Sequence, residues 1–188
     1  MTTSTDWVED HFIAGNVALD LANTVYRRQP ELGADLLTDT EALAAWFTRT
    51  RLLPADGDSG PRVTEAALED ARALRALLWA TFDAQTHGQP IPESALAGLL
   101  DTSRRRVASV VLHHDGSMTV GTADGALAVL ALHAIELVLD PPPSGVRACG
   151  RCGWLFLDSS RGRRRRWCSM KTCGNQAKAA RYRSTHAS

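Results

Sequence analysis

The spacing of the four cysteines restricts the fold of this chain more than any other feature. Cys149 and Cys152 are separated by two residues, Cys168 and Cys173 by four, and fifteen residues lie between the two pairs. Thiolates separated by two to four residues are typical of structural zinc sites, because one turn of the chain can present both sulfurs to a tetrahedral ion. The pattern therefore predicts one structural zinc ion held by these four thiolates.

Two other states of the cysteines stay open at this stage, a pair of disulfides and free thiols. The first twelve residues, MTTSTDWVEDHF, are acidic and lack a basic stretch followed by an apolar run. We therefore expect no signal peptide and a cytoplasmic location, where clustered cysteines bind metal more often than they form disulfides. Four thiolates also fill a tetrahedral shell and leave no position for water, which disfavours a catalytic zinc ion.

The charge of the chain is divided unequally along its length. The 188 residues carry no net charge, but residues 1–146 hold 10 Lys and Arg against 20 Asp and Glu. Residues 147–188 hold 11 Lys and Arg against a single acid, Asp158. Such asymmetry indicates an acidic body and a basic module with a separate partner.

The basic residues of the C-terminal module are candidate nucleic-acid contacts, since clustered cations bind phosphates. Duplex DNA is the expected partner, and RNA stays open because its phosphates look alike to arginine. The alternative is a solvated turn followed by a solubilising tail. The candidate DNA-binding residues are Arg161, Arg163, Arg164, Arg165, Arg166, Lys171, Lys178, Arg181 and Arg183.

The body, residues 1–143, is predicted to be mainly α-helical with one small β-hairpin, an α+β fold. Apolar residues recur every three or four positions along most of it, as on the buried face of a helix. The pattern changes around Asp115-Gly116, a dipeptide typical of hairpin turns. Helices are expected over Asn16–Arg27, from Asp39 or Thr40, over Thr64–His87, near Pro92, and over Asp124–Leu139, the last nearly apolar and therefore central.

A short segment rich in proline, residues 140–145 (DPPPSG), is expected to end the body as a stiff linker. It coincides with the change of charge, so the predicted boundary lies between residues 143 and 144. In the second unit, residues 144–188, a strand over Trp154–Leu157 with Trp167 opposite it and a helix over Asn175–Arg183 predict a treble-clef-like zinc finger. In the body, residues 55–61 (ADGDSGP) are expected to form a loop.

Residues 149–183 resemble the CGNR zinc-finger family, which is named after the residues around its last ligand. The blocks GWLFLD (153–158) and RWCSM (166–170) are similar to that family, whereas Gln176 stands where the family has Arg. The segment LDLANTV (19–25) resembles the opening motif of ABATE, the domain that accompanies this finger. The resemblance implies a bacterial, stress-related transcription regulator with a zinc-dependent DNA-binding end.

Three polar residues, Asp20, Asn23 and Thr24, interrupt an apolar helical segment. They either line a small-molecule pocket in a sensor domain or hydrogen-bond this helix to a neighbouring loop, since buried polar groups need partners. The body is accordingly expected to sense a ligand or to mediate assembly as a homodimer. No nucleophile motif, phosphate-binding glycine loop or pair of carboxylates at catalytic spacing is found, so no enzymatic activity is expected.

The sequence thus predicts a zinc-dependent, DNA-binding transcription regulator. The longest apolar stretch, residues 126–139, is too short to span a bilayer and contains His133 and Glu136, so no membrane partner is expected. The alternative from another class is a protein–protein adaptor whose basic finger docks an acidic partner.

Overall fold

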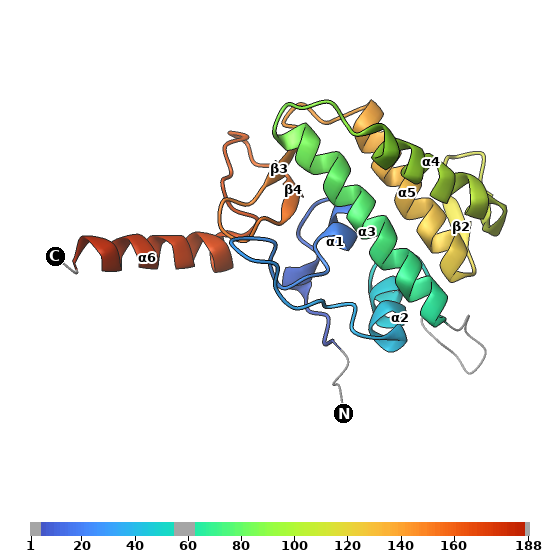
Figure 1. Cartoon of the computed structure of the whole chain (residues 1–188), viewed down its shortest axis with the longest axis horizontal. Helices are drawn as coiled ribbons and strands as arrows, with labels where there is room; N and C mark the ends of the chain where they lie inside the picture. Colours follow the sequence, from blue (N-terminus) through green and yellow to red (C-terminus); the bar gives the residue numbers. More distant parts are fainter. Residues whose placement is uncertain (1–4, 55–62, 187–188) are drawn as a thin grey trace.

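The computed structural model describes residues 5–54 and 63–186 and consists of a helical body with a smaller, mostly irregular C-terminal part (Figure 1). The predicted loop over residues 55–61 lies outside the described residues. In chain order the elements are η1 (Glu9–His11), α1 (Val17–Ala22), α2 (Thr40–Arg49), α3 (Glu65–Thr86), α4 (Glu93–Arg106), η2 (Val107–Ser109), β1 (Val110–Leu112), β2 (Met118–Val120), α5 (Ala123–Leu139), β3 (Val146–Ala148), β4 (Leu155–Leu157), η3 (Met170–Gly174) and α6 (Asn175–Thr185).

The helices of the body begin where the sequence offers a capping side chain. Asp39, Thr64 and Thr122 precede α2, α3 and α5, and each accepts a hydrogen bond from the backbone N–H three residues later. Such a bond satisfies one of the N–H groups that a helix start leaves without a partner. At the other end of α3, Gly88 has φ +65°, a left-handed conformation that favours glycine and ends the helix.

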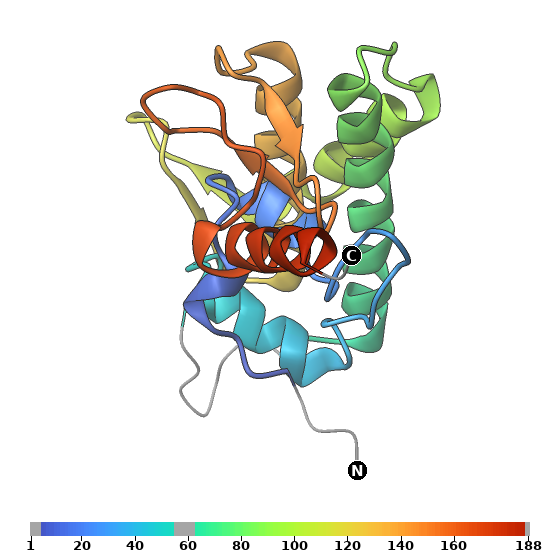
Figure 2. The same ribbon diagram turned by 90° about the vertical axis from the view of Figure 1, so that its left-hand side faces the viewer.

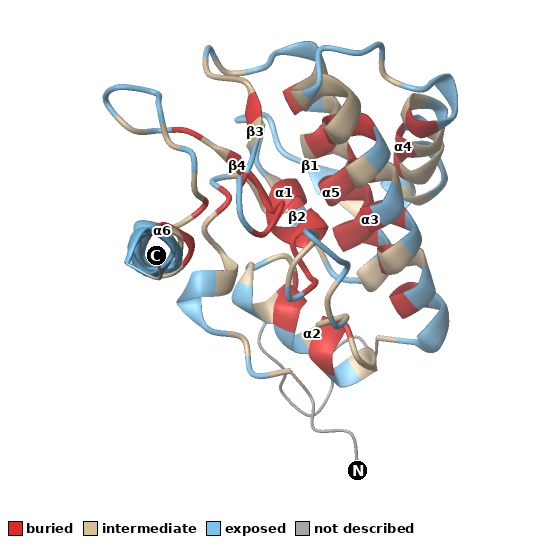
Figure 3. Cartoon of the chain, turned by 60° about the vertical axis from the view of Figure 1, so that its left-hand side comes forward, coloured by how far each residue is buried: buried red, intermediate tan, exposed pale blue. Residues whose placement is uncertain are grey.

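Helix α5 lies at the centre of the body, as its nearly uniform apolar sequence predicts. Nine of its residues are buried, and α1, α3 and α4 pack against it, while the hairpin β1–β2 also contacts it. Figure 3 shows the buried residues gathered where these helices meet. No helix in the described ranges is long and apolar enough to cross a membrane.

The first body helix is shorter than the sequence predicts. The pattern predicts a helix over residues 16–27, but α1 ends at Ala22. Beyond it the chain turns at Asn23 and Thr24 and forms an isolated antiparallel bridge between Val25 and Asp35. The cause is tertiary, because the side chain of Asn23 hydrogen-bonds the distant strand β4 instead of facing solvent.

The second hairpin has a different partner strand from the one expected. Strand β4 pairs antiparallel with β3, with Val146 opposite Leu157, so the hairpin encloses the first cysteine pair. The prediction that Trp167 lies across from this strand is wrong. Trp167 belongs to a segment without regular structure and packs beside the cysteines.

The body and the C-terminal part share one hydrophobic core. Val146 and Leu155, from the two C-terminal strands, are buried in the same cluster as the residues of α1, α3 and α5. The backbone N–H of Leu157 also donates to the carbonyl of Ala14 at 2.8 Å. The two strands are therefore part of the folded body as well as of the cysteine-bearing end.

Helix α6 departs from this arrangement. It projects away from the rest of the molecule (Figure 1) and lies in front of it when viewed from that side (Figure 2). None of its residues is buried, and its main contacts in the described chain are with the adjoining turn η3. An isolated helix of this length is marginal in water, so the contacts with η3 are its main tertiary support in the described chain.

Candidate metal centre and nucleic-acid interface

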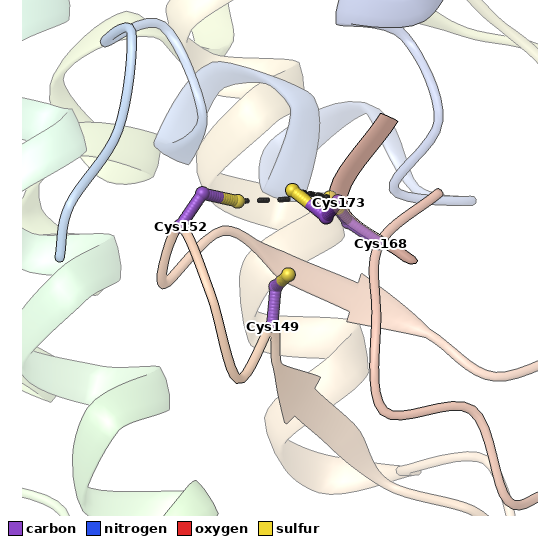
Figure 4. Close-up of side chains that lie close together, drawn as sticks. All are labelled: Cys149, Cys152, Cys168 and Cys173. Carbon is purple, nitrogen blue, oxygen red and sulfur yellow. Dashed lines mark hydrogen bonds between the residues drawn. The ribbon is translucent and has the colours of Figure 1, made fainter. Parts of the chain in front are cut away.

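The four cysteines meet at one point, although they come from separate segments. Cys149 and Cys152 flank a tight turn after β3, Cys168 ends the long loop that follows β4, and Cys173 lies in η3. Their four sulfur atoms all lie within 4.8 Å of one another and face a common centre (Figure 4). The side chain of Ser169 caps η3 by accepting from the N–H of Thr172, which fixes the turn that carries the last thiol.

The sulfur geometry fits one tetrahedral zinc ion. The Sγ atoms of Cys152 and Cys168 are 3.6 Å apart and those of Cys168 and Cys173 are 3.7 Å apart. A tetrahedral zinc ion with Zn–S bonds of about 2.3 Å places its ligands about 3.8 Å apart. A disulfide has a much shorter S–S distance of about 2.05 Å, and all four cysteines are free thiols. The cluster therefore holds one structural zinc ion.

The surroundings of the sulfurs also suit a thiolate centre. All four cysteines are buried, and Phe156, Trp154 and Ile13 pack around them. Hydrogen bonds from the thiols of Cys152 and Cys168 lower the pKa of Cys149, and the same hydrogen bonds raise the pKa of Cys152 and of Cys168. Without a metal ion the cluster therefore favours one thiolate, at Cys149. Deprotonated sulfur is the form that binds zinc, so metal binding releases protons and weakens in acid.

The body braces the turn between the first two cysteines. The backbone N–H groups of Arg28 and Gln29 both donate to the carbonyl of Cys152, at 2.6 and 3.1 Å. A Cβ added at Gly153, which has φ +74°, would lie 2.9 Å from the Cβ of Arg28. The indole N–H of Trp154 donates to the carbonyl of Val25 at 2.9 Å. The metal-binding turn is thus built against the segment that follows α1.

Asn23 joins α1 to strand β4. Its side-chain amide donates to the carbonyl of Leu155 and accepts from the N–H of the same residue, both at 2.8 Å. Asn23 is 2 % exposed, so water cannot easily replace either bond. Thr24 also links two segments, because its hydroxyl donates to the carbonyl of Leu21 and accepts from the guanidinium of Arg75 on α3. These two residues serve as structural links between segments.

Replacing Asn23 with Ala is expected to destabilise the chain by about 2–4 kcal/mol, because it leaves two buried backbone groups of Leu155 without partners. Chemical denaturation of the zinc-loaded protein measures the loss. The exposed Asn175 provides the control, and Asn175→Ala should change the stability by less than about 0.5 kcal/mol. A loss below 1 kcal/mol for Asn23→Ala would show that the link is dispensable.

Asp20 differs from its two neighbours, because it lies at the wall of an open pocket of about 850 Å³ between the body and the C-terminal part. One carboxylate oxygen accepts from the N–H of Ala14 at 3.0 Å. Arg49, Arg165 and Lys171 line the same pocket. Burial raises the pKa of Asp20 to about 7, against the weaker opposing effect of the hydrogen bond from Ala14. Neither Asn23 nor Thr24 lines this pocket.

The raised pKa predicts that Asp20→Asn becomes more favourable as the pH rises. The protonated carboxyl stabilises the fold fully below its unfolded pKa near 4, and this contribution is lost as the pH rises through 7. Asn keeps the acceptor for Ala14 and has no charge to bury. Relative to the unsubstituted chain, the variant should therefore gain about 2–3 kcal/mol of stability between pH 5 and pH 8. Denaturation of both proteins at each pH tests this, and a constant difference would contradict it.

The structure places nearly all the predicted DNA-binding residues on the surface. Eight of the nine are exposed, and none of these eight forms an ion pair within the described ranges. Arg165 is the exception, because its guanidinium donates to the carbonyl of Cys168 and stacks over the ring of Phe156. The exposed set is Arg161, Arg163, Arg164, Arg166, Lys171, Lys178, Arg181 and Arg183.

Asp158 organises the arginine loop, which we define as residues 159–167. Its carboxylate accepts from the N–H and hydroxyl of Ser160 and from the N–H of Arg165, at 2.6 to 3.0 Å. Burial would raise the pKa of Asp158, but these hydrogen bonds outweigh it and lower the pKa. The only acid of residues 147–188 is therefore 3 % exposed and used inside the fold. Residues 147–188 therefore contribute no exposed carboxylate to this basic surface, and the exposed acids beside Lys171 are Glu9 and Asp10 of the body.

The aromatic residues of this region have different environments. Trp154 is buried and Trp167 packs against the cysteine cluster, which favours the packing role over base stacking for both. Tyr182, on α6, is 65 % exposed and stacks on His186, with ring centroids 4.1 Å apart. Tyr182 is thus the one of these three rings that an external base could reach.

Two arginines of the body form ion pairs that the sequence does not predict. Arg28 pairs with Asp83 of α3 at 2.5 Å, and its side chain is 13 % exposed. Arg75 is buried on α3 and binds Asp35 through both terminal nitrogens. Its position on the apolar face of a long helix is the only sequence signal that could identify it.

Comparison with protein families agrees with this architecture. Residues 15–141, more than half of the chain, match the ABATE family, described as "putative stress-induced transcription regulator". Residues 146–186 match the CGNR zinc finger. No curated protein matches the sequence. The two matches occur in the order that the sequence motifs predict, so the chain belongs to the ABATE family and carries a CGNR zinc finger at its C-terminal end.

Proposed function

We propose that this protein is a zinc-dependent, DNA-binding transcription regulator. The observation that carries the proposal is the basic surface on both sides of the zinc site. Eight exposed cations lie in the arginine loop, in η3 and on α6, and Asp158, the only acid of residues 147–188, is buried. Such a surface neutralises phosphates and releases the counterions bound to DNA.

Helix α6 has the dimensions and exposure of an element that enters a groove. Its eleven residues span about 16 Å at 1.5 Å per residue. The major groove of B-DNA, about 12 Å wide, admits a single helix. Lys178, Arg181 and Tyr182 lie within two turns of one another along it, so they would contact phosphates or bases together. Gln176, at its start, offers an amide that suits an adenine edge.

The zinc ion has a structural part in this proposal. It fixes the turn after β3, the residue that follows the arginine loop and η3, which leads into α6, relative to one another, since each contributes a ligand. The body contributes a ligand-sensing or assembly function, in keeping with the stress-related regulators of its family. We place this activity in the bacterial cytoplasm and assign no catalytic residue.

Electrophoretic retardation of duplex DNA by the zinc-loaded full chain tests the proposal. We use the full chain because its strands β3 and β4 share a core with the body. A regulator should retard a duplex at near-physiological salt, and more strongly at lower salt. A protein–protein adaptor should give no retardation, and a preference for duplex RNA over DNA would indicate an RNA-binding module instead.

A further inference from the structure

A second pocket, which we call the junction pocket, lies between the body and the finger. Its volume is about 810 Å³, within the range of small-molecule sites. The last turn of α3, the segment around Arg28, the linker, β3 and the arginine loop line it. Figure 1 shows the C-terminal end of α3 beside β3, and the two elements are in contact.

The lining of the junction pocket is strongly basic. Four arginines line the pocket, Arg28, Arg147, Arg165 and Arg166, and the only carboxylate among its lining residues is Asp83. The guanidinium of Arg165 is already bound to the carbonyl of Cys168 and stacked over Phe156. Asp83 is bound to Arg28 at 2.5 Å. The backbone N–H groups of residues 87–89 donate hydrogen bonds to the carbonyl groups of residues 83–85, at the end of α3. The lining residues therefore carry more positive charge from arginines than negative charge from carboxylates.

Two buried polar atoms of lining residues have no hydrogen-bond partner. They are Nε of Arg147, a donor, and Oε1 of Gln85, an acceptor. A further nitrogen of Arg147 reaches the carbonyl of Arg165 only at 3.4 Å. Both atoms are closed off from solvent, so a bound molecule satisfies them when the two side chains turn toward the pocket, and each new bond then removes the cost of a buried group without a partner. Such a molecule needs an acceptor oxygen and a hydroxyl donor.

We propose that the junction pocket binds a small oxyanion that also carries a hydroxyl group, a phosphate or a hydroxycarboxylate. Guanidinium groups bind both kinds of oxyanion through paired, charge-assisted hydrogen bonds. The ligand contacts Gln85 on the body and Arg147 on the finger, so it joins the two. Because Arg166 belongs both to this pocket and to the exposed basic set, the bound anion competes with DNA for its charge. This last step rests on the proposed function.

Isothermal titration of the zinc-loaded full chain with inorganic phosphate and with citrate, at constant ionic strength, tests the site without DNA. We expect saturable binding of at least one probe, which distinguishes a phosphate site from a hydroxycarboxylate site. Gln85→Glu places a negative charge in the pocket and should weaken that binding at least tenfold. Gln89→Glu makes the same change of charge at an exposed position outside the pocket and should leave it unaltered.

The outcome does not depend on the stability of one variant. If Gln85→Glu fails to fold, the NMR signals of the Arg147 Nε–H and the Gln85 amide should still shift on titration of the unsubstituted chain. Absence of saturable binding by either probe, equal weakening by both variants, or unmoved signals would overturn the site. The coupling is tested separately. The probe that binds should lower duplex affinity at matched ionic strength, and no such effect would overturn the coupling alone.

Discussion

Replacing Cys168 with Ser, or removing zinc with a chelator, is expected to destabilise the whole chain and not the finger alone. A structural zinc ion contributes about 10–16 kcal/mol of apparent binding free energy, comparable to the entire stability of a typical domain. The finger supplies Val146 and Leu155 to the core of the body. Loss of the metal therefore removes support from α1, α3 and α5 as well.

Thermal unfolding followed by far-ultraviolet circular dichroism measures this effect. At about 2–4 °C for each kcal/mol in a chain of this size, the midpoint should fall by about 20 °C or more. Met170→Ser is the matched control, because it also replaces a sulfur side chain with a hydroxyl two residues away but at a position that is 51 % exposed. A helical signal that melts at the same temperature with and without zinc would show that the body folds independently of the finger.

The second large effect is expected when three cations of the arginine loop are neutralised together, in Arg161→Gln/Arg163→Gln/Arg164→Gln. Each phosphate contact contributes about 0.9 to the slope of log K against log salt. If all three arginines contact phosphates, the slope becomes shallower by about 2.7 and the affinity at 0.1 M salt falls by about 500-fold. The loss should be similar for every duplex sequence, since phosphate contacts carry no base information.

A control variant with the same change of net charge separates local contacts from the overall charge. Arg51, Arg104 and Arg105 are exposed on the body, and their joint replacement with Gln should leave the slope unchanged. Fluorescence anisotropy with a labelled duplex measures both variants. If both triple variants lost duplex affinity equally, the arginine loop would contribute only to the overall charge and would not contact DNA directly.

The features that the sequence predicts correctly depend on neighbouring residues. Ligand spacing identifies the zinc site, because two to four intervening residues determine whether a turn can present both thiols. The caps Asp39 and Thr64 mark helix starts, because the capping bond reaches only three residues along the chain. The apolar composition of α5 places it at the centre of the body.

The features that the sequence does not predict arise from contacts between distant segments. Asn23 and Leu155 are 132 residues apart, and their pairing both shortens α1 and anchors β4. Strand β3 has three residues beside a proline-rich linker, too short to recognise by its pattern, so the partner of β4 is assigned incorrectly from the sequence. The same long-range packing brings Arg28 into an ion pair with Asp83, 55 residues away on α3.

The affinity of the zinc-loaded full chain for duplex DNA, measured across a range of salt concentrations, tests the central claim most directly. The same titration is repeated after chelation and again after zinc is restored. We predict that log K falls against log salt with a slope of about −4 to −5, that chelation abolishes binding, and that zinc restores it. No binding to the duplex at low salt, or an affinity that is the same with and without zinc, would contradict a zinc-dependent DNA-binding function.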